Sequence, residues 1–460
     1  MHEAIHWDAD LIRRYDRPGP RYTSYPTALQ FNDQVAGNAL VQALAESRKA
    51  LRPLSVYVHV PFCANICYYC GCNKVITKDR GRAVPYLQRL HEEISRIASQ
   101  LDRRQVVEQL HFGGGTPTFL GHTELRELMR HLRENFTLLD GDSGDYGIEI
   151  DPREADWSTM GLLRELGFNR VSLGVQDLDP QVQQAVNRLQ SFEQTRAIVE
   201  AAWTLQFRSV NIDLIYGLPK QTPERFARTV DKVIELQPDR LSLFNYAHLP
   251  ERFLPQRRIN AEDLPSPSAK LEMLQRSIEQ LTQAGYVYIG MDHFALPDDE
   301  LAVAQEDGML RRNFQGYTTH GHCDLVGLGV SAISQLGDLY CQNSSDLPRY
   351  IAAIDAGHSA VERGLLCNDD DRIRRAVIQH LICSFKLDFS LIESSFNIEF
   401  RGYFAEVWPQ LQQFARDGLI SLSNQGIEVL PAGRLLVRSL CMLFDHYLSE
   451  QNSQRFSRVI

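Results

Sequence analysis

Three closely spaced cysteines are the residues of this chain with the clearest capacity for chemistry. Cys63, Cys67 and Cys70 follow a C-x3-C-x2-C pattern, and Cys72 lies two residues beyond it. Soft thiolates select iron–sulfur clusters or zinc, and three thiolates leave one iron of a four-iron cluster open to a further ligand. The alternative is a zinc site with Cys72 as fourth ligand, but structural zinc sites usually combine two separated ligand pairs. The spacing therefore favours an iron–sulfur cluster.

A glycine run is the second candidate for a binding site. Gly113, Gly114 and Gly115 precede Thr116-Pro117 and directly follow a β-rich segment. Three residues without side chains let a ligand approach the backbone closely and leave NH groups free to bind it. A tight turn between a strand and a helix explains the run equally well. The run by itself does not distinguish these two interpretations.

Polar side chains recur at alternating positions of several β-rich segments. The pairs are Tyr57 with His59, Glu149 with Asp151, and Asn211 with Asp213. Because successive residues of a strand point to opposite faces, the members of each pair share a face. We expect these groups to point into one interior. The alternative is that some of them lie at strand ends in water, since charged residues are rarely buried without partners.

The elements that must position these residues alternate between short β-rich and longer helical segments, which predicts a parallel sheet or barrel. The predicted strands are 54–60, 107–112, 146–151, 169–175, 209–215 and 240–246, and the predicted helices are 83–101, 121–136, 156–167, 191–206 and 222–237. Barrels of this kind keep their active sites at the C-terminal ends of the strands. The cysteine motif follows the first strand, so we expect it at that end.

Three regions are expected along the 460 residues, which is long enough for a large α/β domain and a smaller one. Residues 1–53 form an N-terminal arm contacting the active site, since 17–27 is rich in Pro, Tyr and Arg and has no period. Residues 54–365 form the barrel and its extension. Residues 366–460 form a mainly helical C-terminal domain, because helical periodicity begins near 369.

Composition argues against several classes of protein. Hydrophobic residues make up 43% and charged residues 23%, as in ordinary globular proteins. A net charge of −10 disfavours binding to nucleic acid or anionic membranes, and no apolar run of about 18 residues occurs. Nine cysteines, five of them scattered, do not resemble a disulfide framework. We therefore expect a reduced, cytoplasmic protein without a membrane or nucleic-acid partner.

At the cysteine motif the sequence resembles the radical S-adenosylmethionine superfamily. Its signature, with an aromatic residue before the last cysteine, is matched by Cys63, Cys67, Tyr69 and Cys70. The resemblance implies a partial (β/α)6 barrel and one [4Fe–4S] cluster on the three cysteines, with S-adenosylmethionine chelating the open iron. It also implies that an electron from the cluster cleaves this cofactor into methionine and a 5′-deoxyadenosyl radical. The glycine run is then expected to contact the cofactor's amino group.

The resemblance extends over nearly the whole chain to the oxygen-independent coproporphyrinogen III oxidase family. It rests on GPRYTSYPT at 19–27, YVHVPFC at 57–63, CGCNK at 70–74, HFGGGTPT at 111–118, GVQD at 174–177, NIDLIYGLPKQTPE at 211–224, FNYAHLP at 244–250, GMDHFA at 290–295 and RNFQGYTT at 312–319. The implied reaction is the anaerobic oxidative decarboxylation of two propionates of coproporphyrinogen III to vinyl groups, which gives protoporphyrinogen IX in haem biosynthesis.

The family resemblance also implies two bound S-adenosylmethionine molecules. The positions that match the family's pattern around the first are Tyr57, Gly113, Glu149 and Ile333. Those around the second are Tyr69, Gly114, Gly115, Gln176, Arg188, Asp213 and Ala247. An aspartate suits ribose hydroxyls or a cationic amino group, and an arginine suits a carboxylate. For Arg188 a surface salt bridge is the alternative. Tyr69 stands where the family often has Phe, which keeps the ring and adds a hydroxyl.

Catalytic roles are expected for Tyr57, Cys72 and Glu149, although a local structural role for Cys72 is an equal alternative. His59 shares the face of Tyr57 and is either near the cluster or a hydrogen-bonded interior histidine. Four propionates make the implied substrate anionic, so arginines are expected to anchor it by bidentate pairing. The candidates are Arg21, Arg311 and Arg312, with ordinary solvated arginines as the alternative.

The remaining expectations concern partners and competing functions. The implied reaction needs a reductant such as flavodoxin or ferredoxin, and the chain is expected to be a monomer. A haem-binding relative of the same superfamily, acting as a haem chaperone without decarboxylase activity, is the nearest alternative. Its type usually lacks the 19–27 arm and the Cys72 pattern, both present here. A non-catalytic zinc or electron-transfer module would need no glycine-rich loop and no ligands on six strands.

Overall fold

The computed structural model describes residues 5–35 and 37–448, and the chain divides into two compact units. The barrel unit comprises Phe31–Arg276 and His322–Leu366. The terminal unit comprises Met1–Gln30, Ser277–Gly321 and Cys367–Ile460. Helix α9 (Pro267–Gln283) contains the point in the chain where the first segment of the barrel unit ends.

A parallel sheet forms the centre of the barrel unit, and it contains all six predicted strands. They are β1 (Leu54–Val60), β4 (Val106–Gly114), β6 (Asp145–Ile150), β7 (Arg170–Gln176), β8 (Ser209–Tyr216) and β9 (Arg240–Asn245). Their spatial order is β9-β8-β7-β6-β4-β1, and each neighbouring pair is parallel. Every strand of this sheet therefore ends at the same edge, which collects the residues that follow each strand.

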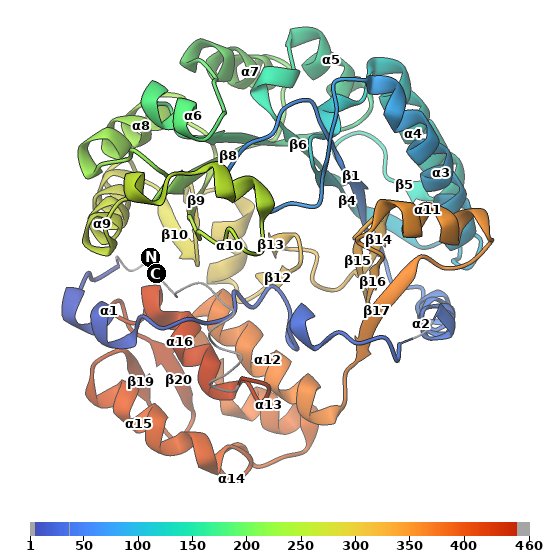
Figure 1. Ribbon diagram of the computed structural model, residues 1–460. Coiled ribbons are helices and arrows are strands. Elements are labelled where there is room, and N and C mark those ends of the chain that lie inside the picture. The colour runs from blue at the N-terminus through green and yellow to red at the C-terminus, as the bar shows by residue number, and fades with distance from the viewer. Residues whose placement is uncertain (1–4, 36, 449–460) are drawn as a thin grey trace. The chain divides into compact units, whose positions relative to one another are not determined.

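Five helices connect these strands, as predicted, and lie along the outer side of the strand arc (Figure 1). They are α3 (Val84–Ala98), α4 (His122–Asn135), α5 (Trp157–Glu165), α7 (Phe192–Thr204) and α8 (Pro223–Glu235), with the additional short helix α6 (Pro180–Ala185) before α7. Local sequence sets their starts. Ser191 and Gln194 form a capping box on α7, and the Thr222 side chain accepts from the Arg225 NH at the start of α8.

The sheet continues beyond β1 as an extension that the sequence pattern did not resolve into strands. Its elements are α2 (Gly37–Ala50), β14 (Asp324–Leu328), β15 (Ile333–Leu336), β16 (Leu339–Asn343), α11 (Leu347–Asp355) and β17 (Val361–Leu366). Strand β14 is parallel to β1, and β15, β16 and β17 follow in antiparallel order. Because β1 pairs with β14 rather than with β9, the six-stranded arc stays open, and the predicted partial barrel is confirmed.

The period of two along β1 separates the core from the site. Val56, Val58 and Val60 are buried, with 1% or less of each side chain exposed, while Tyr57 is the partly exposed residue of the strand. In this segment the hydrophobic effect holds the valine face against the helices. The opposite face is thereby left to carry polar groups.

The terminal unit is mainly helical, as expected for the C-terminal part, but it also contains short strands. Its elements are α1 (Ala9–Tyr15), β10 (Val287–Gly290), β11 (His293–Ala295), α10 (Glu300–Glu306), β12 (Arg311–Asn313), β13 (Gly316–Thr318), α12 (Asp369–Ser384), β18 (Lys386–Asp388), α13 (Phe389–Phe396), α14 (Phe400–Tyr403), α15 (Trp408–Arg416), β19 (Ile420–Leu422), β20 (Gly426–Val429) and α16 (Val437–Cys441). The strands β18, β20 and β19 form an antiparallel sheet.

The proline-rich stretch near the N-terminus packs within the terminal unit. The Arg438 side chain, 4% exposed, donates to the carbonyl oxygens of Gly19 and Pro20. The Tyr22 hydroxyl donates to Asp445 over 2.9 Å. Side chains from the C-terminal end of the chain thus hold this stretch in place.

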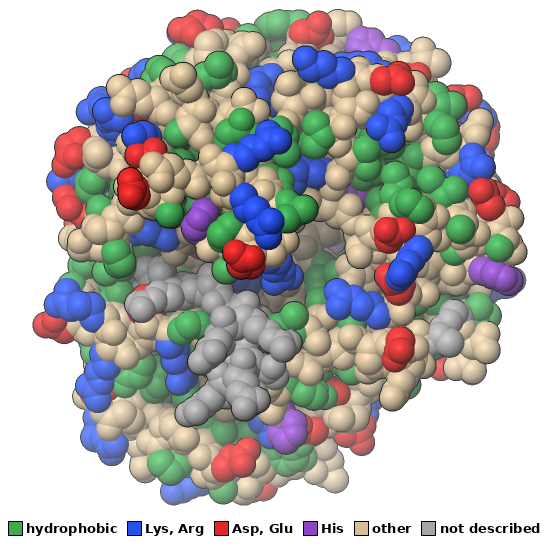
Figure 2. Space-filling view, in the orientation of Figure 1, with side chains coloured by type: hydrophobic (Ala, Val, Ile, Leu, Met, Phe, Trp, Pro, Cys, Tyr) green, Lys and Arg blue, Asp and Glu red, His purple; other side chains and the backbone are tan. Residues whose placement is uncertain are grey.

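The surface mixes charges of both signs. On the face drawn in Figure 2, basic and acidic side chains are interspersed with polar and apolar ones. Among the residues that the structure describes, no helix has both the length and the apolar character that a bilayer span requires.

Candidate active site

The cysteine motif lies on a loop that leaves the C-terminal end of β1. The short strands β2 (Phe62–Cys63) and β3 (Val75–Ile76) pair at the base of this loop and bring its two ends together. The segment after α6 holds its middle: the Tyr68 NH donates to the Val186 carbonyl over 2.9 Å, and the Asn187 side chain donates to the Ile66 carbonyl over 2.7 Å. The predicted position of the motif at the strand ends is therefore observed.

A cavity of about 350 Å³ opens between this loop and the ends of the strands. Its volume is within the range of small-molecule sites. Predicted site residues make up about half of its lining, which comprises Cys63, Ala64, Asn65, Cys67, Tyr69, Cys70, Cys72, Lys74, Gly114, Gly115, Thr116, Glu149, Ile150, Asp151, Arg153, Glu154, Ser172, Gly174, Gln176, Arg188, Asp213 and Phe244.

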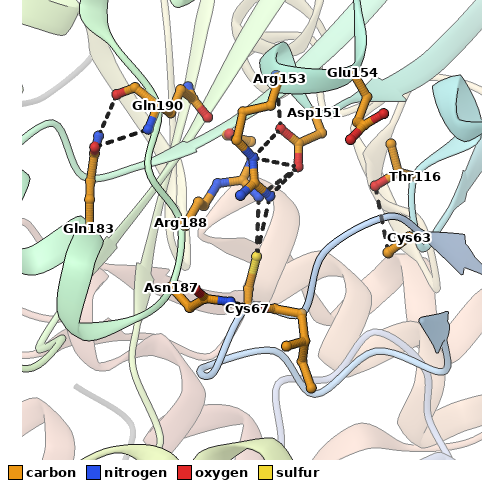
Figure 3. Close-up of polar contacts among 12 residues, drawn as sticks. Cys63, Cys67, Thr116, Asp151, Arg153, Glu154, Gln183, Asn187, Arg188 and Gln190 are labelled. Atoms are coloured by element: carbon orange, nitrogen blue, oxygen red, sulfur yellow. Dashed lines mark hydrogen bonds and ion pairs between the residues drawn. The ribbon is translucent and has the colours of Figure 1, made fainter. Parts of the chain in front are cut away.

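Two arginines place positive charge against the sulfur of Cys67. Arg153 and Arg188 each have a guanidinium nitrogen 3.5 Å from Cys67 Sγ (Figure 3). Asp151 lies behind both: its Oδ2 accepts from Arg153 over 2.6 Å and from Arg188 over 3.0 Å. Burial raises the pKa of the Asp151 carboxyl, but the two guanidiniums outweigh it and lower the pKa below its ordinary value. Two cations and one anion thus face the thiol, which favours a negatively charged ligand set.

The other cysteines have different surroundings. Cys63 Sγ lies 3.6 Å from Thr116 Oγ1, and burial raises the pKa of this thiol to about 11. Hydrogen bonding from Cys72 lowers the pKa of Cys70 despite the opposing effect of burial, with Lys74 contributing in the same direction. The Lys74 ammonium also donates to the carbonyls of Cys70 and Cys72, over 2.9 and 3.3 Å. Cys72 is therefore a hydrogen-bonding neighbour of Cys70.

The spacing of the sulfurs bears on the choice between cluster and zinc. One zinc ion with thiolates at about 2.3 Å needs sulfurs roughly 3.8 Å apart. Throughout the described residues, the group of His, Cys, Asp and Glu side chains whose ligand atoms all lie within 4.8 Å of one another contains none of these cysteines. A four-iron cluster binds each thiolate through a different iron, so its ligands are more widely separated. The donor set therefore fits a cluster better than a single ion.

Close packing leaves no room for side chains at Gly113 and Gly114, and the NH groups of Gly114 and Gly115 already donate hydrogen bonds within the protein. A Cβ at Gly113 would lie 2.7 Å from Glu149 Oε1, and one at Gly114, whose φ is +116°, would lie 2.5 Å from the His59 ring. The Gly114 NH donates to Glu149 Oε2 over 3.1 Å, and the Gly115 NH donates to the Val60 carbonyl over 2.8 Å. The expectation that these NH groups are free for a ligand was wrong. The run instead lets the backbone approach Glu149 and His59.

A chain of hydrogen bonds joins Tyr57 to the cysteine loop. The Tyr57 hydroxyl lies 3.0 Å from His59 Nδ1, and His59 Nε2 lies 3.2 Å from the Asn73 carbonyl. Because a carbonyl can only accept, Nε2 carries the hydrogen and Nδ1 accepts from Tyr57. Burial lowers the pKa of His59, which keeps the ring neutral. His59 therefore orients Tyr57 beside the loop rather than binding the cluster as a cation.

Glu149 is held in place from two sides. His111 Nε2 lies 3.4 Å from its Oε1, and the His111 ring stacks on Tyr57 with ring centroids 6.1 Å apart. Burial raises the pKa of Glu149, but the hydrogen bond and positive potential from His111, with the bond from the Gly114 NH, lower it overall. The carboxylate is therefore ionised at neutral pH and points into the cavity.

The opposite wall carries a second carboxyl group and two polar atoms without partners. Asp213 accepts from the Asn211 side chain over 2.8 Å and from the Ser172 hydroxyl over 3.2 Å, and burial raises its pKa to about 6. Among the described residues, Gln176 Oε1 and Arg188 Nε are buried without a hydrogen-bond partner. Such groups are costly unless a ligand or water satisfies them. This wall therefore fits a polar ligand with donors and acceptors.

Four predicted site residues do not line the cavity directly. Tyr57 and Gly113 lie behind Glu149, as their contacts above show. The Ala247 carbonyl accepts from Gln256, which also donates to the Tyr69 carbonyl, so Ala247 is tied to the cysteine loop. The Ile333 backbone lies against Gly327, the neighbour of Tyr57 in β14.

The three arginines considered as substrate anchors lie in the terminal unit. Arg21 is paired with Asp292. The Arg311 guanidinium donates to the carbonyls of Gly308 and Leu310, each over 2.8 Å. Arg312 is 6% exposed and stacks on Tyr317, and its Nε and Nη1 have no hydrogen-bond partner among the described residues. Arg312 is thus the one of the three whose guanidinium has unsatisfied donors.

Sequence reasoning missed several residues of the site. Arg153 and His111 were assigned no role, although both lie at positions that a parallel barrel predisposes to function. Arg153 follows β6 in the sequence Asp-Pro-Arg-Glu, and His111 precedes the glycine run on β4. For Arg153, the available signal was a charged residue in the loop just after a strand, whereas His111 lies within β4 and had no such signal.

Comparison with known proteins gives the family. The model of the radical SAM superfamily matches residues 57–233, and that of the HemN C-terminal domain matches residues 367–436. The chain is 72% identical over 460 residues to the oxygen-independent coproporphyrinogen III oxidase of Pseudomonas aeruginosa, covering 100% of both chains. It is 52% identical over 459 residues to the protein of the same name from Escherichia coli, covering 100% of this chain and 99% of that one.

A solved structure agrees with the sequence relatives. The coproporphyrinogen III oxidase HemN from Escherichia coli, described as a radical SAM enzyme, superposes with a TM-score of 0.93 at 51% identity. The match covers 97% of this chain and 100% of that one. With the three-thiol loop at the mouth of an open barrel, these matches show that the chain belongs to the oxygen-independent coproporphyrinogen III oxidase family of the radical SAM superfamily.

Proposed function

We propose that this chain converts coproporphyrinogen III to protoporphyrinogen IX without oxygen, removing two propionate carboxyl groups as CO2 and leaving two vinyl groups. The observation that carries the proposal is the cavity that joins the three-thiol loop to buried polar groups that have no partner in the described part of the chain. The chain that contains this cavity is 72% identical over its whole length to the oxygen-independent coproporphyrinogen III oxidase of Pseudomonas aeruginosa.

The residues of the loop fit the cofactors that the superfamily implies. Cys63, Cys67 and Cys70 would hold a [4Fe–4S] cluster, and Arg153 and Arg188 would balance its negative charge at Cys67. When bound, the cluster supplies an electron and an open iron site for S-adenosylmethionine, whose cleavage generates the radical that attacks the substrate. Glu149, ionised and aimed into the cavity, would bind the cationic amino group of this cofactor.

Two groups of polar residues support the binding of two S-adenosylmethionine molecules. The first group is built around Glu149, which contacts Gly114 and packs against Gly113 and Tyr57. The second group flanks Gly174: a Cβ there would lie 2.9 Å from Gln176 Nε2 and 3.2 Å from Arg188 Nη2. Each group offers a different combination of charge and hydrogen-bonding atoms, so each suits a different bound molecule.

The reaction balances without a general acid or base. For each propionate, S-adenosylmethionine bound at the cavity would supply the radical chemistry that removes one hydrogen atom from the β-carbon. The carbon radical that remains then loses CO2 and one electron, which forms the vinyl double bond. The electron passes to a one-electron acceptor, and a reductant such as flavodoxin or ferredoxin supplies the electrons for cofactor cleavage. Cys72, which lines the cavity, is our candidate for a group beside the reacting atoms, and Tyr57 supports catalysis from behind Glu149. We also propose that the chain is a cytoplasmic monomer.

Arg312 is our choice for a propionate anchor. A buried guanidinium with free donors binds a carboxylate strongly, because the pair is charge-assisted and can be bidentate. Arg311 is already engaged with two backbone carbonyls, and Arg21 with Asp292. We expect Arg312→Lys to raise the KM for coproporphyrinogen III about tenfold, as the loss of one charged hydrogen bond predicts, with little change in kcat. Arg311→Lys is the matched control and leaves KM within about twofold.

The test of the function is an anaerobic assay. The protein with its cluster reconstituted is given reductant, S-adenosylmethionine, coproporphyrinogen III and a one-electron acceptor. Protoporphyrinogen IX, measured as its oxidised porphyrin, and 5′-deoxyadenosine should both appear, and both should vanish without S-adenosylmethionine. Two molecules of 5′-deoxyadenosine per porphyrin support one hydrogen abstraction for each propionate. If 5′-deoxyadenosine forms while coproporphyrinogen III survives, the proposed substrate is wrong, and haem binding becomes the next measurement.

A further inference from the structure

Three side chains with metal-binding atoms meet in the barrel unit away from the cavity. His322 Nε2 lies 2.8 Å from Glu108 Oε2, and Cys323 Sγ lies 3.6 Å from the same oxygen. The ligand atoms of all three lie within 4.8 Å of one another. A carboxylate oxygen, an imidazole nitrogen and a thiol sulfur thus converge on one point.

This cluster lies at the opposite end of the sheet from the three-thiol loop. Glu108 is near the start of β4, and Cys323 directly precedes β14, whereas the cavity lies where the strands end. A strand of seven residues, the length of β1, spans about 20 Å. The two sites are therefore separate, and the proposed reaction does not use Glu108, His322 or Cys323.

A β-bulge aims Glu108 at the other two residues. Strands β4 and β14 are both neighbours of β1, which lies between them. In the pairing of β1 with β4, Leu54 is opposite Val107 and Ser55 is opposite Gln109, so Glu108 is the extra residue. A bulge re-aims a side chain and is often associated with a site. Because β1 begins only at Leu54, the Glu108 side chain can reach past its start to Cys323.

The three donors match a borderline-soft divalent ion such as Zn²⁺. Zinc takes Cys sulfur at about 2.3 Å, His nitrogen at about 2.0–2.1 Å and carboxylate oxygen at about 2.0–2.2 Å in tetrahedral geometry. That geometry separates sulfur from oxygen by about 3.6 Å and nitrogen from oxygen by about 3.4 Å. The first value equals the observed separation, and the second requires His322 to move by roughly 0.6 Å from its 2.8 Å contact. Calcium and magnesium prefer oxygen ligands alone.

We propose that Glu108, His322 and Cys323 bind one Zn²⁺ ion at the N-terminal end of the barrel sheet. On binding, the Cys323 thiol gives up its proton to solvent and the sulfur bonds to the metal, while the Glu108 carboxylate and neutral His322 each contribute one lone pair. Water completes the coordination. The ion connects Glu108 of β4 with Cys323, the residue before β14. Strands β4 and β14 flank β1. It is a structural rather than a redox centre.

Zinc content of the protein with its iron–sulfur cluster in place is the measurement. The anaerobically reconstituted protein is exposed to Zn²⁺, desalted, and analysed for zinc and iron per chain. We expect about one zinc per chain, retained in Cys341→Ala and His358→Ala as controls and lost in the double variant His322→Ala, Cys323→Ser. Glu108→Gln, which keeps the side-chain size, should weaken zinc binding at least tenfold. Iron per chain should stay constant throughout, because the cluster cysteines are not involved.

X-ray absorption at the zinc edge tests the proposal on the wild-type protein and therefore does not depend on the folding of any variant. In the wild-type protein it should show one sulfur at about 2.3 Å together with nitrogen and oxygen at about 2.0–2.2 Å. Three or four sulfurs around zinc would overturn the proposal, because they would place the ion on the cluster loop. Absence of retained zinc, or unchanged zinc in the double variant, would overturn it as well. Zinc should also raise the melting temperature of the wild-type protein but not of Glu108→Gln.

Discussion

Buried polar groups in the barrel unit behave differently in its two halves. Under the sheet extension, Glu93 of α3 is 6% exposed, and its carboxylate accepts from the Gly329 NH, the Asn343 amide and the Tyr350 hydroxyl, each over 2.7 Å. At the cavity, Gln176 Oε1 and Arg188 Nε are also buried but have no hydrogen-bond partner among the described residues. The hydrogen bonds of Glu93 are thus complete within the protein, whereas those of the two cavity residues are incomplete.

This difference in hydrogen bonding indicates which buried polar groups stabilise the fold and which are available to bind a ligand. A fully hydrogen-bonded buried carboxylate stabilises the fold and has no capacity left for a ligand. Burial raises the pKa of Glu93, and the hydrogen bonds from its three donors act in the opposite direction. Burying this carboxylate therefore costs desolvation free energy, which the three hydrogen bonds offset. A buried atom without a partner lowers stability until something binds it. Incomplete hydrogen bonding at the strand ends therefore distinguishes the proposed binding site more clearly than burial does.

The largest expected effect is at the cluster loop. Cys67→Ala removes the sulfur that faces Arg153 and Arg188, so we expect loss of the visible absorption of the cluster and of 5′-deoxyadenosine formation. Cys341→Ala, a buried cysteine outside the motif, should retain both. Absorption spectra and product analysis of the two variants, reconstituted in parallel, provide the measurement. A cluster that persists in Cys67→Ala contradicts the assignment of this ligand.

The second effect is on stability. Glu93→Ala leaves three buried donors without an acceptor, at about 1–3 kcal/mol for each unsatisfied group, and we expect the free energy of unfolding to fall by at least about 3 kcal/mol. Glu92→Ala, on the exposed side of the same helix, should change it by less than about 0.5 kcal/mol. Urea unfolding of both variants measures the difference. Equal stability of the two would mean that the Glu93 contacts contribute nothing.

The third prediction contrasts two glutamines. Gln176→Met removes an acceptor that has no partner among the described residues, so stability should hold or rise while the Kd for S-adenosylmethionine increases about tenfold. Gln183, by contrast, donates to the Gln190 carbonyl over 2.7 Å (Figure 3). It also donates to the Asp177 carbonyl over 2.9 Å. Gln183→Met should destabilise the protein by about 1–3 kcal/mol. Thermal unfolding and equilibrium binding of both variants test the contrast. It is contradicted if Gln176→Met lowers stability while Gln183→Met does not.

The smallest expected effect depends on pH. The pKa of Asp213 is raised to about 6, so the folded state holds this proton more tightly than the unfolded state does. The stabilising contribution of the proton is complete below about pH 4 and is lost as pH rises through about 6. Asp213→Asn should therefore be more stable than the wild type by about 1–2 kcal/mol at pH 8, and the gain should shrink towards pH 4.

Binding should change in the opposite sense at the same residue. If Asp213 accepts from a cationic or hydroxyl group of S-adenosylmethionine, wild-type affinity falls as pH drops below about 6, and the affinity of Asp213→Asn is lower and independent of pH in that range. Asp231→Asn, an exposed position on α8, is the control for general charge effects. Parallel pH profiles in wild type and Asp213→Asn would remove Asp213 from the site.

Sequence alone determined the elements of the barrel and the cysteine loop. The six strands and five connecting helices were predicted to within a few residues, because hydrophobic period, helix caps and strand composition are local properties. The three cysteines that we propose as cluster ligands could also be selected from the sequence, since their spacing within eight residues is itself the chemical signal. The extension β14–β17 and the sheet β18–β20 were not resolved, because their short strands depend on pairing with distant segments.

Tertiary structure alone decided which polar residues line the cavity and which complete their hydrogen bonds within the fold. Arg153 and Arg188 reach Cys67 from 86 and 121 residues away, and Glu93 meets Asn343 across 250 residues. In the sequence, Glu93 is one charged residue in an amphipathic helix and Gln176 one polar residue at a strand end. Whether a polar atom finds its partner within the protein depends on packing between distant segments, and no local pattern carries that information.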